Sequence, residues 1–481
     1  MRIAQIAPLM ESVPPKLYGG TERIVSYLTE ELVKLGHDVT LFASGDSVTS
    51  AKLVGCVPTA LRLDPKVCDV IPYYMLMLDR VRSQSQQFDI LHFHIDYLHF
   101  PLFRDMSSRV LTTLHGRQDL PDNKPIYIGF DEMRLISISD SQRTPISIAN
   151  FAKTIYHGLP GTDLKLTLRP QGGYLAFLGR IAPEKGPETA IQIARSAGIP
   201  LKIAAKIDRV DEQYFRERIA PLLDQPGIEF IGEINEHQKA EFLGQASGLL
   251  FPIDWPEPFG LVMIEAMACG TPVLAFNRGS VSEIIEDGKT GIVVQSKDEA
   301  IKKLPHLLTL DRRRIRHEFE RRFSAQRMAH DHIGLYQELI KGERECLVQS
   351  AFQSDALENA QQADQSRSHS MTKVVQAPYP LATPAPFLSS RPSISYEPFT
   401  SPYVRLLQQP SRRMLHGPHA TLESSQSAKK KRARDRKGFR PRAKPSNVRR
   451  KRPGGVIRIW SIISGPPASR KPSTKRKRGS V

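Results

Sequence analysis

Short apolar runs alternate with amphipathic segments of helical length over the first 345 residues of the chain. In the first half, this pattern predicts strands over residues 2–8, 38–43, 89–95, 109–115 and 134–139. Between the first two strands, Ile24, Leu28 and Leu32 recur on one helical face, and Gly36 ends the predicted helix. Strands that alternate with helices indicate a parallel sheet covered by helices on both faces.

The same rhythm restarts after Gly172 and Gly173. Strands are predicted over residues 174–180, 201–207, 228–234, 248–253, 271–276 and 291–294. We therefore expect an α/β protein with two doubly wound, Rossmann-like domains, residues 1–165 and 166–322, followed by a helix over residues 323–342. Neither domain shows a G-x-G-x-x-G fingerprint after its first strand, which argues against a dinucleotide oxidoreductase.

The formal net charge of +18 is concentrated in the C-terminal part of the chain. Residues 351–481 hold 27 of the 68 basic and 6 of the 50 acidic residues, so they carry +21 and the first 350 residues carry −3. Leu, Ile, Val and Phe make up only 22 of these 131 residues, and 15 of the 37 prolines lie there. Low apolar content with high charge predicts that residues 346–481 are a disordered basic tail.

The rest of the composition favours a cytoplasmic protein. There is no apolar run of the ~18 residues that span a bilayer, and the N-terminus lacks the layout of a secretory signal. The four cysteines form no C-x-x-C pair. This spacing excludes a disulfide scaffold and a local zinc site, so we expect a reducing compartment.

The segment Phe251–Val273 carries the most informative chemistry. Pro256 and Pro258 delay a helix until about Phe259, so Glu257 lies at the mouth of that helix and Glu265 lies up to two turns inside it. The two carboxylates are then roughly 10–12 Å apart. Between them, the free amides around Gly260 and Leu261 favour an anion. A ligand with hydroxyls at both ends and a phosphate in the middle, such as a nucleotide sugar, fits this spacing.

The run EPFGLVMIEAMACGTPV resembles the signature of retaining glycosyltransferases of family 4. The resemblance covers about residues 1–342, because YGGTERIV, HFHIDY, TLHGR, ISISDSQR and FLGRIAPEKG follow in the order of that family. It implies the GT-B architecture, in which two Rossmann-like domains face a cleft and the final helix returns to the first domain. It also implies a metal-independent retaining hexosyltransferase that moves a sugar from a nucleotide-sugar donor to an acceptor hydroxyl.

The resemblance assigns roles to individual residues. Glu257 would bind hydroxyls of the transferred sugar and Glu265 those of the ribose. Arg180 and Lys185 would stabilise the leaving diphosphate in place of a metal ion, and His94 would reach the reacting sugar or the acceptor. The remaining donor candidates are Gly19, Gly20, Ile231, Gly260 and Leu261, and the acceptor-side candidates are Asp96, His115 and Arg117. No cofactor or metal is expected.

Several alternatives stay open at this point. A sugar-nucleotide epimerase or a phosphorylase would use the same architecture, and the basic tail would suit binding to nucleic acid or to an anionic membrane. The acceptor would be a carbohydrate or a lipid-linked molecule, the latter with peripheral contact at the inner face of a membrane.

Overall fold

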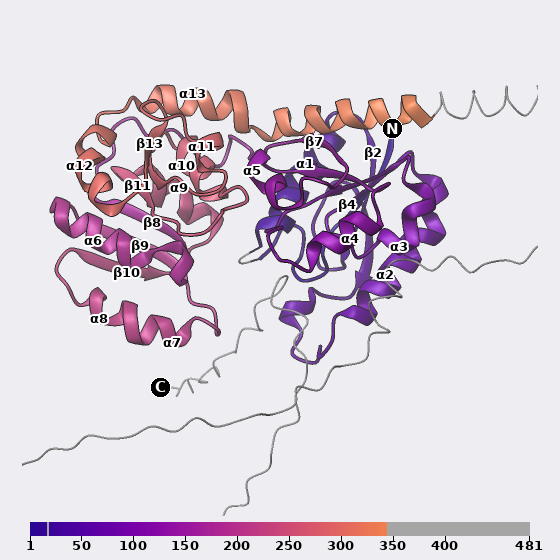
Figure 1. Ribbon diagram of the computed structural model, residues 1–481, viewed down its shortest axis with the longest axis horizontal. Helices are drawn as coiled ribbons and strands as arrows, with labels where there is room; N and C mark the ends of the chain where they lie inside the picture. The colour runs from indigo at the N-terminus through magenta and orange to yellow at the C-terminus, as the bar shows by residue number, and fades with distance from the viewer. Residues whose placement is uncertain (17–18, 344–481) are drawn as a thin grey trace, which may run out of the picture. The chain divides into compact units, whose positions relative to one another are not determined.

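Two parallel β-sheets form the framework of the protein in a computed structural model that describes residues 1–16 and 19–343 (Figure 1). Within these residues, the first sheet has seven strands in the order β3-β2-β1-β4-β5-β6-β7, and the second has six in the order β10-β9-β8-β11-β12-β13. The register is continuous across the central strands, where Ile3 on β1 lies between Val39 on β2 and Ile90 on β4. The described residues all fall within one compact unit of the chain.

The first sheet is built from residues of the N-terminal domain. Its strands are β1 (Arg2–Ile6), β2 (Asp38–Ser44), β3 (Lys52–Val57), β4 (Ile90–Phe93), β5 (Val110–Thr113), β6 (Arg134–Ser137) and β7 (Phe151–Thr154). Its helices are α1 (Gly20–Lys34), α2 (Ile71–Gln84), α3 (Phe100–Phe103), α4 (Asn123–Gly129) and α5 (Asp140–Arg143). In α1, Ile24, Leu28 and Leu32 are buried, as the sequence pattern predicts.

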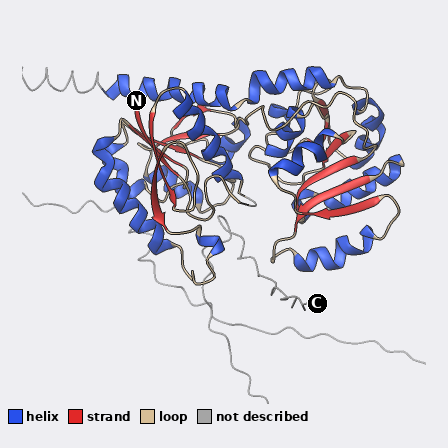
Figure 2. Cartoon of the chain, turned by 180° about the vertical axis from the view of Figure 1, so that it is seen from behind, coloured by secondary structure: helices blue, strands red, loops and turns tan. Residues whose placement is uncertain are grey.

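The second sheet belongs to the C-terminal domain. Its strands are β8 (Leu175–Arg180), β9 (Leu201–Lys206), β10 (Ile228–Gly232), β11 (Gly248–Phe251), β12 (Val273–Phe276) and β13 (Gly291–Val294). Its helices are α6 (Pro187–Ala197), α7 (Glu212–Tyr214), α8 (Ala220–Leu223), α9 (Glu236–Gly244), α10 (Leu261–Ala268), α11 (Val281–Ile284), α12 (Lys297–Leu307) and α13 (Arg312–Phe323). In each domain the strands lie among covering helices (Figure 2), which confirms the prediction of two Rossmann-like domains.

Two strands of the first sheet, β3 and β7, were not expected from the sequence. Both are edge strands, because they end the strand order. Their burial is only partial, Lys52 begins β3 and Lys153 lies within β7. An edge strand exposes one side to solvent, so it does not carry the continuous apolar run of a central parallel strand.

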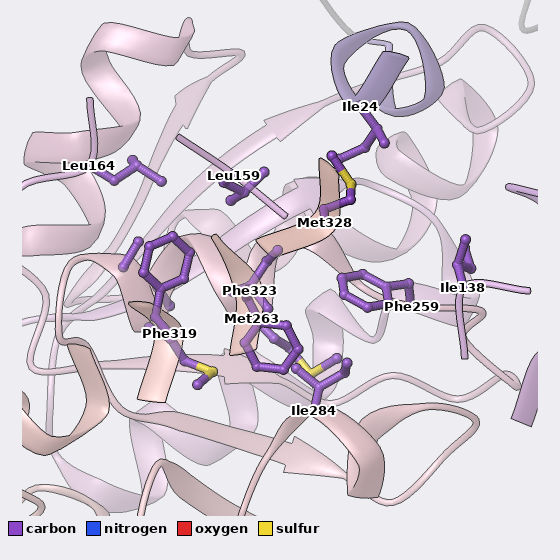
Figure 3. Packing of buried hydrophobic residues seen from close by; sticks show 14 of the residues in the cluster. Ile24, Ile138, Leu159, Leu164, Phe259, Met263, Ile284, Phe319, Phe323 and Met328 are labelled. Atoms are coloured by element: carbon purple, nitrogen blue, oxygen red, sulfur yellow. The ribbon is translucent and has the colours of Figure 1, made fainter. Parts of the chain in front are cut away.

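The last described helix, residues 325–343, follows α13 and is drawn in orange in Figure 1. It contacts the first domain, because the hydroxyl of Tyr336 accepts a hydrogen bond from the side chain of Gln5 at 3.2 Å. One hydrophobic cluster contains side chains from α1, α10, α13 and this helix, among them Ile24, Met263, Phe323 and Met328 (Figure 3). The interior is thus continuous from one domain to the other.

Among residues 1–16 and 19–343, no helix is both long enough and apolar enough to cross a membrane. The expected disordered tail, residues 346–481, lies outside the described residues.

Candidate functional site

A cavity of about 550 Å³ is lined by residues of both domains. In a doubly wound sheet, ligands bind beyond the carboxyl ends of the strands, and the lining comes from loops and helix starts at those ends. The cavity brings together nearly all of the site residues expected from the sequence: Gly19, Gly20, His94, Asp96, His115, Arg117, Arg180, Lys185, Glu257, Gly260, Leu261 and Glu265. Ile231 is not among the lining residues, since it lies near the end of edge strand β10 with 41% of its surface exposed.

Lys185 and Glu257 form an ion pair in the wall of the cavity. The Lys185 ammonium lies 2.6 Å from a Glu257 carboxylate oxygen, and the indole N–H of Trp255 donates to the same oxygen at 2.9 Å. Lys185 is held close to the loop after β11 because the next residue, Gly186, has a φ of +69°. A β-carbon on Gly186 would lie 2.2 Å from the carbonyl oxygen of Pro252, so only glycine permits this approach.

Arg180, the last residue of β8, is surrounded by carboxylates. Its guanidinium lies 2.5 Å from Glu184, 3.2 Å from Asp211 and 3.5 Å from Asp208. Its charge is therefore compensated within the protein. An anionic ligand at this position would have to compete with these carboxylates for the guanidinium.

The start of α10 faces the same cavity. The helix begins at Leu261, close to the start expected from the two prolines, and Gly260 precedes it with a φ of +80°. The first amides of a helix have no partner within it, and the helix dipole adds partial positive charge there. In α10 the N–H of Met263 already donates to the carbonyl oxygen of Gly260 at 3.0 Å, so the amides before Met263 are the ones that could meet a ligand. This helix end adds positive potential to the cavity, which the Lys185–Glu257 ion pair also lines.

Glu265 lies on α10 and is buried, with 3% of its surface exposed. Burial alone would raise the pKa of its carboxyl, but the positive charges of Arg23 and Lys239 outweigh this effect and lower the pKa to about 2. The carboxylate lies 2.6 Å from Arg23 and 3.2 Å from Lys239. It is therefore ionised at neutral pH and accepts hydrogen bonds only.

His94 lies at the end of β4 and has both ring nitrogens engaged by the protein. Its Nε2 lies 2.7 Å from the amide oxygen of Gln5, which only accepts, so Nε2 carries the proton. Its Nδ1 then accepts from Nε2 of His115 at 2.9 Å. In this arrangement the His94 ring has no nitrogen available to a sugar, although the residue lines the cavity.

The hydrogen bonds continue behind His94 into the core. The Gln5 amide nitrogen donates to the hydroxyl of Tyr336, which donates to Nδ1 of His92 at 2.7 Å. His92 is fully buried, and its Nε2 donates to Thr113 at 2.7 Å. Burial lowers the pKa of His92 and of His94 and keeps these rings neutral.

Two carboxylates on the first-domain side have raised pKa values. Burial raises the pKa of Asp96 to about 6 and that of Glu22 to about 7. Asp96 also has a φ of +50°, an unusual conformation for a residue other than glycine. Such strain is concentrated at functional sites in proteins. Arg117, another acceptor-side candidate, pairs with Asp119 at 2.6 Å.

The cavity is also lined by polar residues that the sequence did not indicate as site residues, namely Glu22, Arg23, Arg62, His157, Glu236 and Lys239. Arg23 follows the glycine pair within the first turn of α1, which was the one signal that could have identified it. His157 lies in the segment after β7. Its ring stacks on that of His115 with 5.2 Å between the ring centroids, and it meets Phe259 edge-on with a centroid distance of 4.9 Å. Over the described ranges, no group of three or more His, Cys, Asp or Glu side chains is placed to hold a metal ion.

Two Rossmann-like domains that line one cavity define the GT-B class of fold. A family model described as glycosyl transferases group 1 matches residues 165–325, and a model described as glycosyltransferase family 4 matches residues 18–144. The chain belongs to these glycosyltransferases, of the GT-B family 4 type, and is a transferase enzyme.

Proteins similar to this chain in sequence agree with this assignment. The chain is 25% identical over 339 residues to an uncharacterized glycosyltransferase of Methanocaldococcus jannaschii, across 61% of this chain and 86% of the relative. It is 34% identical over 160 residues to the D-inositol 3-phosphate glycosyltransferase of Paenarthrobacter aurescens, across 28% of this chain. That match spans only 38% of the relative's length.

Solved structures share the fold. Sucrose-phosphate synthase from Thermosynechococcus elongatus superposes with a TM-score of 0.59 at 18% identity, covering 71% of this chain and 99% of the synthase. A glycosyltransferase involved in avilamycin A biosynthesis superposes with a TM-score of 0.54 at 20% identity, covering 71% of this chain and 98% of that glycosyltransferase.

Proposed function

We propose that the protein is a retaining, metal-independent glycosyltransferase that moves a sugar from a nucleotide-sugar donor to an acceptor hydroxyl. The observation that carries this proposal is that Glu257, Glu265 and Lys185 line one cavity with the start of α10. The two carboxylates would bind hydroxyls at the two ends of the donor. The diphosphate would lie between them, against positive groups.

Departure of the nucleoside diphosphate develops negative charge on the bridging oxygen, and this charge must be stabilised in the transition state. Lys185, Arg180 and the amides at the start of α10 are the groups that would stabilise it. The Lys185 ammonium is oriented by its 2.6 Å contact with Glu257 before any ligand binds. A group that is already oriented needs little reorganisation when the charge appears.

The acceptor would enter along the first domain, where Asp96, His115 and Arg117 line the cavity. We propose a same-face substitution through an oxocarbenium-like state, in which the leaving phosphate takes the proton of the acceptor hydroxyl. In this mechanism His94 would shape the cavity through its ring and not serve as a general base, which agrees with the engagement of both its nitrogens.

Release of nucleoside diphosphate tests the proposal. Uridine, guanosine and adenosine diphosphate sugars are first screened for a rise in melting temperature, because a ligand that binds only the folded state stabilises it. The donor that binds is then incubated with a panel of sugars and polyols, with and without EDTA. Nucleoside diphosphate release that requires an acceptor and survives EDTA is expected, and NMR of the product should show the anomeric configuration of the donor.

The other outcomes contradict the proposal in distinct ways. Conversion of the donor to an isomer without an acceptor would identify an epimerase. Phosphate-dependent cleavage of a glycoside would identify a phosphorylase. A product with the inverted anomeric configuration would agree with sugar transfer but refute retention. Loss of activity in EDTA that magnesium restores would refute metal independence.

A further inference from the structure

We propose that Arg23, a residue of the first domain, positions Glu265 of the second domain for the ribose of the donor. This inference rests on the proposed function, because it takes the ribose as the partner of Glu265. It adds a residue to the donor site that does not touch the donor itself. The ribose subsite would then be complete only when both domains contribute.

The contacts to Glu265 are unequal at its two oxygens. The Arg23 guanidinium and the Lys239 ammonium both contact Oε1, at 2.6 Å and 3.2 Å. Both of the contacts that the structure shows for this carboxylate are therefore made at the same oxygen. A carboxylate offers about four lone-pair sites over its two oxygens. The clamp at Oε1 therefore fixes the carboxylate plane and leaves Oε2 to accept from a ribose hydroxyl.

Charge and burial support this division of roles. Arg23 is 7% exposed and Glu265 is 3% exposed, so each charge depends on the other for compensation. Burial would lower the pKa of the Arg23 guanidinium, but Glu265 and Glu236 outweigh burial and raise it. Arg23 contacts Glu236 at 2.7 Å, so two cations and two carboxylates form a neutral cluster between α1, α9 and α10.

The start of α1 brings Arg23 to this position. Gly19 precedes the helix, and a β-carbon there would lie 2.8 Å from Cβ of Pro15, so a side chain would force the segment apart. Arg23 lies in the first turn, where its backbone N–H donates to the carbonyl oxygen of Gly19 at 3.2 Å. Gly19 thus allows the chain to pack closely at the start of the helix that carries Arg23.

An oriented, ionised acceptor gains affinity because its rotamer entropy is lost before the ligand binds. Without Arg23, Glu265 would keep only the longer contact with Lys239 and would rotate more freely. The expected loss therefore concerns the ribose hydroxyls and not the diphosphate, which would lie at Lys185 and the start of α10.

Calorimetry on the full chain tests the proposal with three probes: the nucleoside diphosphate found in the donor screen, its 2′-deoxy analogue and inorganic pyrophosphate. The wild type is expected to bind the ribonucleotide more tightly than the deoxy analogue. Arg23→Gln should weaken ribonucleotide binding about tenfold, remove most of the preference for ribose and leave pyrophosphate binding unchanged. Lys34→Gln, which removes an exposed cation from the same helix, is the matched control and should behave as the wild type.

A ribose preference that persists in Arg23→Gln would overturn the proposal, as would an equal loss for all three probes. If Arg23→Gln does not fold, Lys239→Gln removes the other cation at Oε1 and should reduce the same preference by a smaller factor, because its contact is longer. An unchanged preference in Lys239→Gln counts against the clamp. Failure of the wild type to bind any nucleoside diphosphate would instead refute the proposed function, and the ribose role of Glu265 with it.

Discussion

Replacement of His332 by Asn should change the pH dependence of stability by an amount that follows from burial. His332 lies on the last helix with 3% of its surface exposed, and its Nδ1 donates to the Met328 carbonyl at 2.8 Å. Burial lowers the pKa of this histidine to about 4, from 6.5 in an unfolded chain. Between these values the unfolded chain binds one proton more than the folded chain, so stability falls as the pH decreases.

The magnitude can be worked out from the two pKa values. From pH 7 to pH 5, the linkage removes about 2 kcal/mol from the free energy of unfolding of the wild type, and below pH 4 the loss approaches about 3 kcal/mol. His332→Asn keeps an N–H donor for Met328 and removes the titration. The difference in unfolding free energy between wild type and variant should therefore shift by about 2 kcal/mol in favour of the variant between pH 7 and pH 5.

Urea denaturation at both pH values, followed by circular dichroism, measures this difference. The wild type must be compared with the variant, because Asp96 and Glu22 also titrate in both proteins. Burial raises the pKa of these two carboxyls, so they increase stability as the pH decreases, opposite to His332. His330→Asn, on the exposed side of the same helix, is the control. A wild-type-to-variant difference that stays constant within about 0.5 kcal/mol between the two pH values would refute the reasoning.

Three further substitutions test the site. Glu257→Gln should keep binding free nucleoside diphosphate by calorimetry while its transfer rate falls at least tenfold, because the carboxylate is needed for the sugar and not for the phosphates; weakened nucleotide binding with normal transfer would contradict this. Arg180→Ala should lose most of the rise in melting temperature that nucleoside diphosphate causes, and an unchanged rise would remove Arg180 from the donor site. Gly186→Ala should lower stability by roughly 1–3 kcal/mol in urea denaturation, because it combines a left-handed φ with a clash against Pro252; a neutral effect would show that this turn tolerates a side chain.

The central strands of both sheets could be predicted, because buried parallel strands read as continuous apolar runs. The edge strands β10 and β13 could also be predicted, because both remain mostly apolar, although no residue of β10 is buried. The edge strands β3 and β7 could not, since Lys52 and Gly55 in β3 and Lys153 in β7 leave only short apolar runs. The start of α10 could be placed within two residues, because Pro256 and Pro258 act locally on the backbone.

The part of the cavity lining that belongs to local sequence motifs could be predicted, whereas the contacts between the lining residues could not. Glu257, Glu265 and Lys185 belong to local motifs, and the cavity contains all three. The contact between Arg23 and Glu265 joins residues far apart in the sequence, and no local pattern encodes it. The same holds for Gln5, whose amide fixes the proton on His94.

The hydrogen bond between Gln5 and Tyr336 has a consequence for biosynthesis. Translation produces the amino-terminal domain first, yet its central strand β1 lacks one buried partner until a residue from the last described helix has been made. This hydrogen bond can therefore form only after nearly all of the described part of the chain has been made. A nascent chain stalled shortly after Phe323 would expose this unfinished surface to chaperones and proteases.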